Sequence, residues 1–244
     1  IKTENVKVIY DFGKSSETRA LNGVSVEIYP EEYVILFGPS GCGKSTLLYA
    51  LLGLEKPTEG RVIVAGGRDL SDYSEKEITS YHRKSIGMIF QAYYLIPSIS
   101  VLDNVALPQI FQGISEERRS SHAKTLLERF GIGTQVEKYP TSLSGGQQQR
   151  VAICRSLINN PQIILADEPV GNLDSVSAEA VMGMLKEINE RDKKTIVLVT
   201  HDQRYLHYAH RVYYIRDGLV EREVTNYEKA QVRKVPVLAG ARTG

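Results

Sequence analysis

A glycine-rich segment has the residue types and the spacing of a phosphate-binding loop. Residues 38–46 fit the pattern G-x-x-x-x-G-K-[ST], and they are Gly38, Pro39, Ser40, Gly41, Cys42, Gly43, Lys44, Ser45 and Thr46. Glycines let backbone N–H groups turn towards phosphate oxygens, and the start of a following helix adds partial positive charge. Lys44 can reach the β- and γ-phosphates of a nucleotide, and the Ser45 hydroxyl can ligate Mg²⁺.

The neighbouring sequence supplies the elements that such a loop needs. The apolar run Tyr33–Phe37 predicts a buried strand before the loop. Residues Ser45–Leu54 predict a helix after it, and Gly53 is a helix-ending residue. A strand, a glycine-rich turn and a helix N-terminus together form an anion site, whereas an isolated glycine-rich turn could match the pattern by chance.

Two carboxylates end another apolar run, Ile163–Glu168. Asp167 lies at the end of this predicted strand, where it can complete the Mg²⁺ shell beside Ser45. Glu168 is placed to orient or deprotonate a water in line with the γ-phosphate. Two adjacent carboxylates are also common in solvated loops, so this interpretation depends on the phosphate-binding loop upstream.

A second possible anion site lies at residues 143–147. Leu143, Ser144, Gly145, Gly146 and Gln147 precede a predicted helix over Gln148–Ile158. The Ser144 hydroxyl and the backbone N–H groups of Gly145 and Gly146 suit an anion at a helix N-terminus. In isolation the same residues would be read as an ordinary helix cap.

Strands and helices alternate along the chain, which predicts an α/β fold. Alternating apolar residues in the first 30 positions predict half-buried antiparallel strands, and continuous apolar runs predict further strands at Arg61–Ala65, Ser85–Phe90, Gln162–Ala166 and Thr195–Thr200. A helix is expected over Ala178–Arg191. Between Ala92 and Asn160 the pattern becomes helical, with one apolar face at Ala123, Leu126, Leu127 and Phe130.

Composition limits the classes of function. The net charge of the 244 residues is +1, which gives no support for nucleic-acid binding. Two cysteines fit a reducing compartment and no disulfide framework. No apolar run approaches the roughly 18 residues that a membrane-spanning helix needs. The sequence begins with Ile1 rather than Met, which is consistent with a fragment of a longer or fused protein.

The three motifs together resemble those of the nucleotide-binding subunit of ABC transporters, from about Thr3 to Asn226. Residues 38–46 resemble Walker A, and residues 163–168 resemble Walker B with its catalytic glutamate. Residues 143–147 resemble the family's signature. The resemblance implies a phosphate-loop NTPase fold with a mixed central sheet, an N-terminal antiparallel β subdomain and an inserted helical subdomain. One domain is expected over 1–227, with the core at 1–91 and 161–227 and the helical subdomain at 92–160.

The resemblance also implies individual roles. Gln91 matches the Q-loop glutamine, Asn172–Asp174 the D-loop, and His201 the switch histidine. An aromatic that stacks on adenine is expected at Tyr10, with Phe12 as the alternative. The implied catalytic residues are Glu168, His201, Gln91 and Lys44. The implied ligands of Mg²⁺ are Ser45, Gln91 and Asp167. The implied contacts to ATP come from Tyr10, the loop residues, Ser144–Gln147 and Asp174.

The implied partners are a membrane permease and a second copy of the chain. In a head-to-tail homodimer, ATP at Lys44 and Ser45 of one copy is covered by the signature of the other, on the cytoplasmic face of the membrane. Tyr94–Pro97 with Val101–Pro108 resembles the branch that includes lipoprotein-release, macrolide-export and cell-division ATPases. The alternatives are an importer ATPase of the polar amino-acid type and an ABC ATPase without a transporter; the signature argues against a small-molecule kinase. Residues 228–244 are predicted to be a loose tail, with a membrane or partner contact as the alternative.

Overall fold

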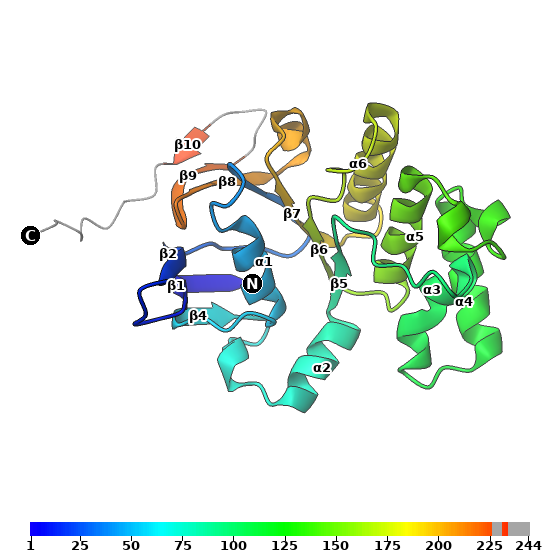
Figure 1. Cartoon of the computed structure of the whole chain (residues 1–244), viewed down its shortest axis with the longest axis horizontal. Coiled ribbons are helices and arrows are strands. Elements are labelled where there is room, and N and C mark those ends of the chain that lie inside the picture. Colours follow the sequence, from blue (N-terminus) through cyan, green and yellow to red (C-terminus); the bar gives the residue numbers. More distant parts are fainter. Residues whose placement is uncertain (226–230, 234–244) are drawn as a thin grey trace, which may run out of the picture. The chain divides into compact units, whose positions relative to one another are not determined.

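The computed structural model describes residues 1–225 and 231–233 (Figure 1). The chain divides into two compact units. The first unit contains residues 1–73 and the described residues from 199 onwards, and the second contains residues 74–198.

The first unit contains a three-stranded antiparallel sheet in the order β2-β1-β4. Its strands are β1 (Lys2–Tyr10), β2 (Thr18–Val24) and β4 (Glu59–Ile63). Val6 and Val8 of β1 are buried, as their alternation with polar residues predicts. Val26 and Ile28, predicted to continue this strand pattern, are also buried but lie beyond the end of β2.

The same unit contains a second, mixed set of strands in the order β10-β9-β8-β3. These are β3 (Tyr33–Phe37), β8 (Arg211–Arg216), β9 (Leu219–Thr225) and β10 (Gln231–Arg233). β3 pairs with β8 in parallel, while β8 pairs with β9 and β9 with β10 antiparallel. Helix α1 (Lys44–Leu52) follows β3, and short 3₁₀ helices occupy Leu70–Asp72 (η1) and Gln203–Tyr208 (η4).

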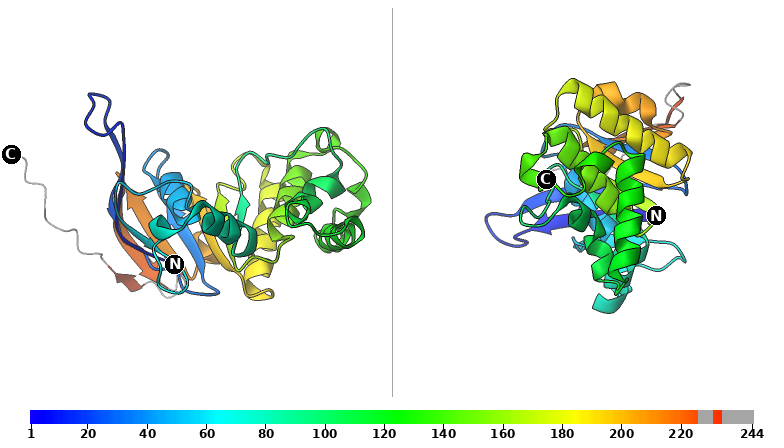
Figure 2. Two further views of the ribbon diagram at one scale, coloured as in Figure 1. Left: turned by 90° about the horizontal axis from the view of Figure 1, so that it is seen from below. Right: turned by 90° about the vertical axis from the view of Figure 1, so that its right-hand side faces the viewer.

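The second unit has parallel strands and most of the helices. Its strands follow the order β7-β6-β5, with β5 at Ile86–Ile89, β6 at Ile163–Asp167 and β7 at Thr195–Thr200. The last two residues of β7, Val199 and Thr200, already belong to the first unit. β5 and β6 run parallel. The helices are α2 (Glu75–Lys84), α3 (Val101–Ile110), α4 (Glu116–Arg129), α5 (Gly145–Leu157) and α6 (Ser175–Glu190), with 3₁₀ turns η2 (Gly133–Gln135) and η3 (Pro140–Ser142). α3, α4 and α5 pack against one another (Figure 2).

This architecture confirms the predicted α/β fold with a mixed sheet and an antiparallel sheet. None of the helices within residues 1–225 and 231–233 is long and apolar enough to cross a membrane. Of the predicted tail, Gln231–Arg233 form β10, and the remainder of 228–244 lies outside the described residues.

Candidate active site

The glycine-rich loop connects β3 to α1 in the first unit. Gly43 caps α1 with φ 101°, and Gly41 has φ 78°. Both values lie in the left-handed region that residues with a Cβ avoid. This conformation lets consecutive backbone N–H groups turn to one side of the loop, which is the geometry of an anion-binding concavity.

Lys44, the first residue of α1, is buried, with 5% of its surface exposed. Its Nζ donates to the Pro39 carbonyl at 2.6 Å and contacts Cys42 Sγ at 4.0 Å. The ammonium is therefore folded over the loop that precedes it. Because an ammonium has three protons, it can hold the Pro39 carbonyl and still donate to phosphate oxygens.

The backbone of the β8–β9 hairpin supports the loop. A Cβ at Gly38 would lie 2.1 Å from the Ile215 carbonyl oxygen, so only glycine allows this approach. Gly218 donates its backbone N–H to the Cys42 carbonyl at 3.1 Å, and Asn22 donates its backbone N–H to the Gly218 carbonyl at 2.8 Å. This support was not predicted from the sequence, although Asp217-Gly218 is a typical signal of a tight hairpin.

Tyr10 ends β1, and 42% of its surface is exposed. Its hydroxyl donates to Glu55 at 3.0 Å. The pKa of Tyr10 is raised, chiefly by partial burial, and a hydrogen bond with Thr46 only partly offsets this effect. Tyr10 is thus tied to the helix that begins at Lys44, whereas Phe12 lies in the following turn with 66% exposure.

His201 directly follows β7 and belongs to the first unit, like the glycine-rich loop. It is exposed. The next residue, Asp202, accepts a hydrogen bond from the backbone N–H of Arg204 and caps η4. Hydrogen bonding from the Arg204 side chain lowers the pKa of Asp202. The end of β7 and the capped turn therefore fix the position of the His201 backbone.

In the second unit, Asp167 is the buried last residue of β6 and Glu168 follows it, half-buried. Glu168 has φ 43°, a left-handed conformation that is rare for a glutamate. Its carbonyl accepts the backbone N–H of Gly171 at 3.1 Å, which closes a tight turn. Strained backbone of this kind is concentrated at functional sites, which favours a chemical role for Glu168.

The structure brings Gln91 next to the segment after Glu168. β5 and β6 are parallel, with Ile89 opposite Ala166. Gln91 and Glu168 therefore both lie just beyond the carboxyl ends of these two strands. Asn172 Nδ2 donates to the Gln91 carbonyl at 3.4 Å. A Cβ at Gly171 would lie 2.9 Å from Gln91 Nε2. Gln91 itself is exposed.

Ser144 is the N-cap of α5, which therefore begins three residues earlier than predicted. Ser144 Oγ accepts the backbone N–H of Gln147 at 3.3 Å, and Gln147 Oε1 accepts that of Ser144 at 3.0 Å. This capping box places Gly145 and Gly146 in the first turn. The first N–H groups of a helix have no partner within it, so those of Gly145 and Gly146 suit an anion.

Asp174 caps α6 and accepts the backbone N–H groups of Val176 and Ser177, each at 3.0 Å. Hydrogen bonding from Ser177 lowers the pKa of Asp174. The same Ser177 packs against the signature, because a Cβ at Gly146 would lie 2.7 Å from its Oγ. The second unit thus joins the segments around Gln91, Glu168, Asp174 and Ser144.

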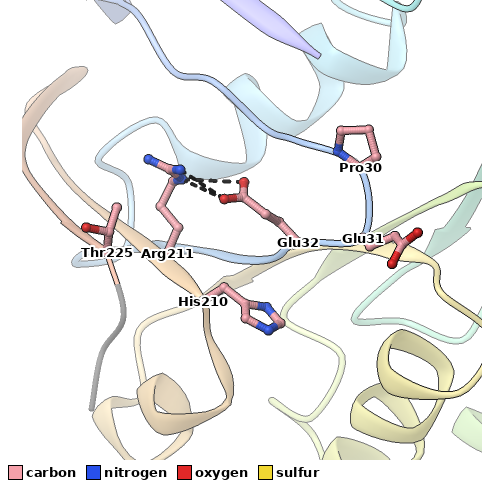
Figure 3. A pocket seen from close by; sticks show the side chains of 6 residues that line it. All are labelled: Pro30, Glu31, Glu32, His210, Arg211 and Thr225. Atoms are coloured by element: carbon pink, nitrogen blue, oxygen red, sulfur yellow. Dashed lines mark hydrogen bonds and ion pairs between the residues drawn. The ribbon is translucent and has the colours of Figure 1, made fainter. Parts of the chain in front are cut away.

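One pocket of the first unit contains none of the predicted site residues (Figure 3). Its volume is about 340 Å³, and it is lined by Pro30, Glu31, Glu32, His210, Arg211 and Thr225. Arg211 forms ion pairs with Glu32, at 2.9 Å, and with Glu223. His210 Nδ1 accepts the backbone N–H of Tyr33 at 2.9 Å. The Arg211 guanidinium and His210 Nδ1 are thus already occupied by the fold, so this pocket is not assigned to the site.

Comparison with known proteins agrees with these motifs. The family described as "ABC transporter" matches residues 21–171. The ABC transporter ATP-binding protein MJ1508 of Methanocaldococcus jannaschii is 48% identical, over 89% of this chain and 96% of its own. The lipoprotein-releasing system ATP-binding protein LolD of Shewanella denitrificans is 40% identical, over 90% of this chain and 93% of its own. The macrolide export ATP-binding/permease protein MacB of Hyphomonas neptunium is 40% identical, over 100% of this chain and 37% of its own.

A solved structure has the same fold. It shows the ATP-binding cassette MJ0796 as a dimer in a post-hydrolysis state with ADP and Pi. The TM-score is 0.84 at 43% sequence identity, and the match covers 92% of this chain and 97% of that one. This chain therefore belongs to the ABC transporter family and is an ATP-binding protein that hydrolyses ATP.

Proposed function

We propose that this chain is the ATP-binding subunit of a transporter complex in which ATP binding and hydrolysis drive an integral membrane partner. The observation that supports the ATP site most strongly is the loop from Gly38 to Lys44. It combines left-handed glycines, a helix N-terminus and a buried lysine in one short segment. In this proposal the loop residues Ser40, Gly41, Cys42 and Gly43 surround the phosphates. Ser45 and Thr46 follow Lys44 in the first turn of α1, and Tyr10 stacks on the adenine.

The residues present suit Mg²⁺. Ser45, Gln91 and Asp167 offer hydroxyl, amide and carboxylate oxygens, which are the hard ligands that Mg²⁺ prefers. Mg²⁺ is usually held by one or two carboxylates together with substrate phosphates, so a single buried carboxylate such as Asp167 fits that mode. When bound, the ion would neutralise charge on the β- and γ-phosphate oxygens.

Glu168 is assigned as the general base of hydrolysis. It takes a proton from a water whose oxygen forms a bond to the γ-phosphorus, while the bond to the ADP oxygen breaks. Lys44 stabilises charge on the γ-phosphate. His201 and Gln91 orient the water and the phosphate. Because a backbone hydrogen bond closes the turn from Glu168 to Gly171, the backbone that carries the Glu168 side chain is held in one conformation.

A second copy of the chain would complete the site. The Ser144–Gln147 cap leaves the N–H groups of Gly145 and Gly146 without helical partners, and these would face the γ-phosphate held by the other copy. Asp174, which caps α6 beside Gly146, would position the same surface. The dimeric structures of MJ0796 support a homodimer, and its head-to-tail arrangement is part of this proposal.

The membrane partner is inferred from the relatives. LolD belongs to a lipoprotein-releasing system, and MacB joins an ATP-binding part to a permease in one chain. We therefore assign this chain to a peripheral position on the cytoplasmic face of a membrane, bound to a separate permease of the lipoprotein-release or export type. Nucleic acid is not among its proposed partners.

The test uses Glu168→Gln protein as bait in solubilised native membranes, with ATP present and identification of what is retained. Because the carboxylate is lost while the nucleotide contacts remain, the protein should stay in its ATP-bound form. A permease with a large extracytoplasmic domain would support the proposed partner. A many-span importer permease would replace it with the importer alternative. Recovery of ribosomes or DNA would overturn the transporter assignment.

A further inference from the structure

The segment from Phe90 to Tyr94, here called the Q-loop, is held mainly by side chains. It follows β5 and contains Gln91. Its carbonyl groups accept hydrogen bonds from three side chains: Phe90 from Gln149 Nε2 at 3.5 Å, Gln91 from Asn172 Nδ2 at 3.4 Å, and Tyr93 and Tyr94 from Arg155. Gln149 and Arg155 both belong to α5, the helix that begins at the signature.

Arg155 makes the shortest of these contacts. Its two terminal nitrogens donate to the Tyr94 carbonyl at 2.5 Å and to the Tyr93 carbonyl at 2.8 Å. Hydrogen bonds from an ionised donor are roughly twice as strong as neutral ones, and those from Gln149 and Asn172 are neutral and long. Arg155 therefore dominates the attachment of the Q-loop to α5.

The backbone of the Q-loop is shaped to meet this guanidinium. Tyr94 has φ 46°, in the left-handed region, so it is strained for a residue with a large side chain. The rings of Phe90 and Tyr94 pack edge to face, with centroids 5.1 Å apart, which closes the loop. In the resulting compact turn, the carbonyls of Tyr93 and Tyr94 both accept hydrogen bonds from the planar guanidinium of Arg155.

Arg155 is half-buried, and burial lowers its pKa. Among the described residues no carboxylate forms an ion pair with it. Its charge is therefore balanced by the carbonyl dipoles of the Q-loop. Moving the loop away from α5 would leave that charge partly buried and poorly solvated, which makes separation costly.

We propose that Arg155 is a positioning residue that locks the Q-loop to the signature helix, so that Gln91 and Ser144 move as one body. This inference rests on the proposed function of Gln91. A second contact between the Q-loop and α5 lies at the first turn of that helix. There the Tyr93 hydroxyl approaches Gly145 so closely that a Cβ at Gly145 would lie 2.8 Å from it. The Q-loop thus contacts α5 both near its first turn and near its last.

The direct test exploits the absence of tryptophan from the chain. In Tyr94→Trp protein, the single indole reports the motion of the Q-loop through its fluorescence anisotropy. Arg155→Met in this background should lower the anisotropy towards that of a freely rotating surface side chain. The matched control is Arg150→Met, because Arg150 lies on the same helix with its guanidinium near Gly131. An unchanged anisotropy for Arg155→Met, or an equal fall for both variants, would overturn the proposal.

A kinetic test uses the chain without the reporter. Arg155→Met should lower kcat roughly tenfold or more with little change in the KM for ATP, because the glycine-rich loop is intact. Arg155→Lys should recover part of the loss, since it keeps the charge without the planar fork. In Gln91→Ala protein the further loss from Arg155→Met should nearly vanish. Fully additive losses would mean that Arg155 does not act through Gln91. The anisotropy result stands even if the assignment of Gln91 fails.

Discussion

Gly41→Ala should separate phosphate binding from the stability of the fold. Gly41 has φ 78°, and a Cβ there would meet no atom within 4 Å. The substitution therefore introduces backbone strain without a steric clash. It should weaken ATP binding, because the left-handed conformation turns neighbouring N–H groups towards the phosphates and the new methyl group enters the space beside them.

The magnitudes follow from the structure. An L-residue in the left-handed region costs about 1–2 kcal/mol, and the restriction of the unfolded chain returns about 0.4–1 kcal/mol. For a chain of this length a net loss of about 1 kcal/mol lowers Tm by roughly 2–4 °C. Losing one hydrogen bond to a charged phosphate costs about 1.5–3 kcal/mol, which raises the Kd for ATP roughly 10- to 150-fold.

Gly66→Ala is the matched control. Gly66 lies in the turn after β4 with φ 89°, and a Cβ there also meets nothing within 4 Å. Thermal unfolding should show similar Tm losses for the two variants, while calorimetric titration with ATP should show weakened binding only for Gly41→Ala. If both variants bind ATP equally well, the phosphate-binding role of Gly41 is wrong.

Three further predictions concern the two cysteines, Glu168 and Asp174. Burial raises the pKa of the Cys42 thiol, and it raises that of Cys154 to about 12. Alkylation should therefore be slow at Cys42, with a rate that still increases above pH 9, and negligible at Cys154. ATP should protect Cys42, and mass spectrometry would identify the alkylated cysteines. Glu168→Asn should abolish turnover without lowering Tm, because asparagine tolerates φ 43° better than glutamate; a clear loss of Tm would contradict the strain argument. Asp174→Ala should lower Tm, whereas Asp174→Asn should not, because asparagine also caps helices. Since the pKa of Asp174 is lowered, the stability that its carboxylate contributes is fully present above the ordinary carboxyl pKa and is lost as the pH falls through the lowered value. Thermal melts recorded against pH should therefore show this acid-side loss of Tm in the original protein and not in Asp174→Asn.

Local features of the site could be predicted because they are encoded within a few residues. Gly43 and Gly53 bound α1 with left-handed conformations, as their positions in the sequence indicate. The apolar runs before Gln91 and through Asp167 are parallel strands that end at one edge. Strand hydrophobicity and glycine spacing are short-range signals, so the sequence alone predicts these features.

Other features were missed or misplaced, although some had a signal. The predicted helices at Gln148–Ile158 and Ala178–Arg191 begin three residues earlier, because the caps are Ser144 and Asp174. α2 was not predicted, although Ser74 and Glu77 form a capping box there.

The contacts of Arg155 had no local signal. Its hydrogen-bond partners lie 61 and 62 residues away in the sequence. Their convergence depends on how α5 packs beside β5, and on the left-handed conformation of Tyr94, which no short pattern marks. Features of this kind follow from tertiary packing, so they required the structure.

The central claim is that two copies of this chain share each ATP between the glycine-rich loop of one and the signature of the other. The most direct test is the mass of Glu168→Gln protein by light scattering, with and without saturating ATP. The account predicts about 54 kDa with ATP, twice the chain mass of 27.2 kDa, and a return to the mass of one copy when Ser144→Arg is added. A mass of one copy at saturating ATP, or a dimer that is indifferent to Ser144→Arg, would contradict it.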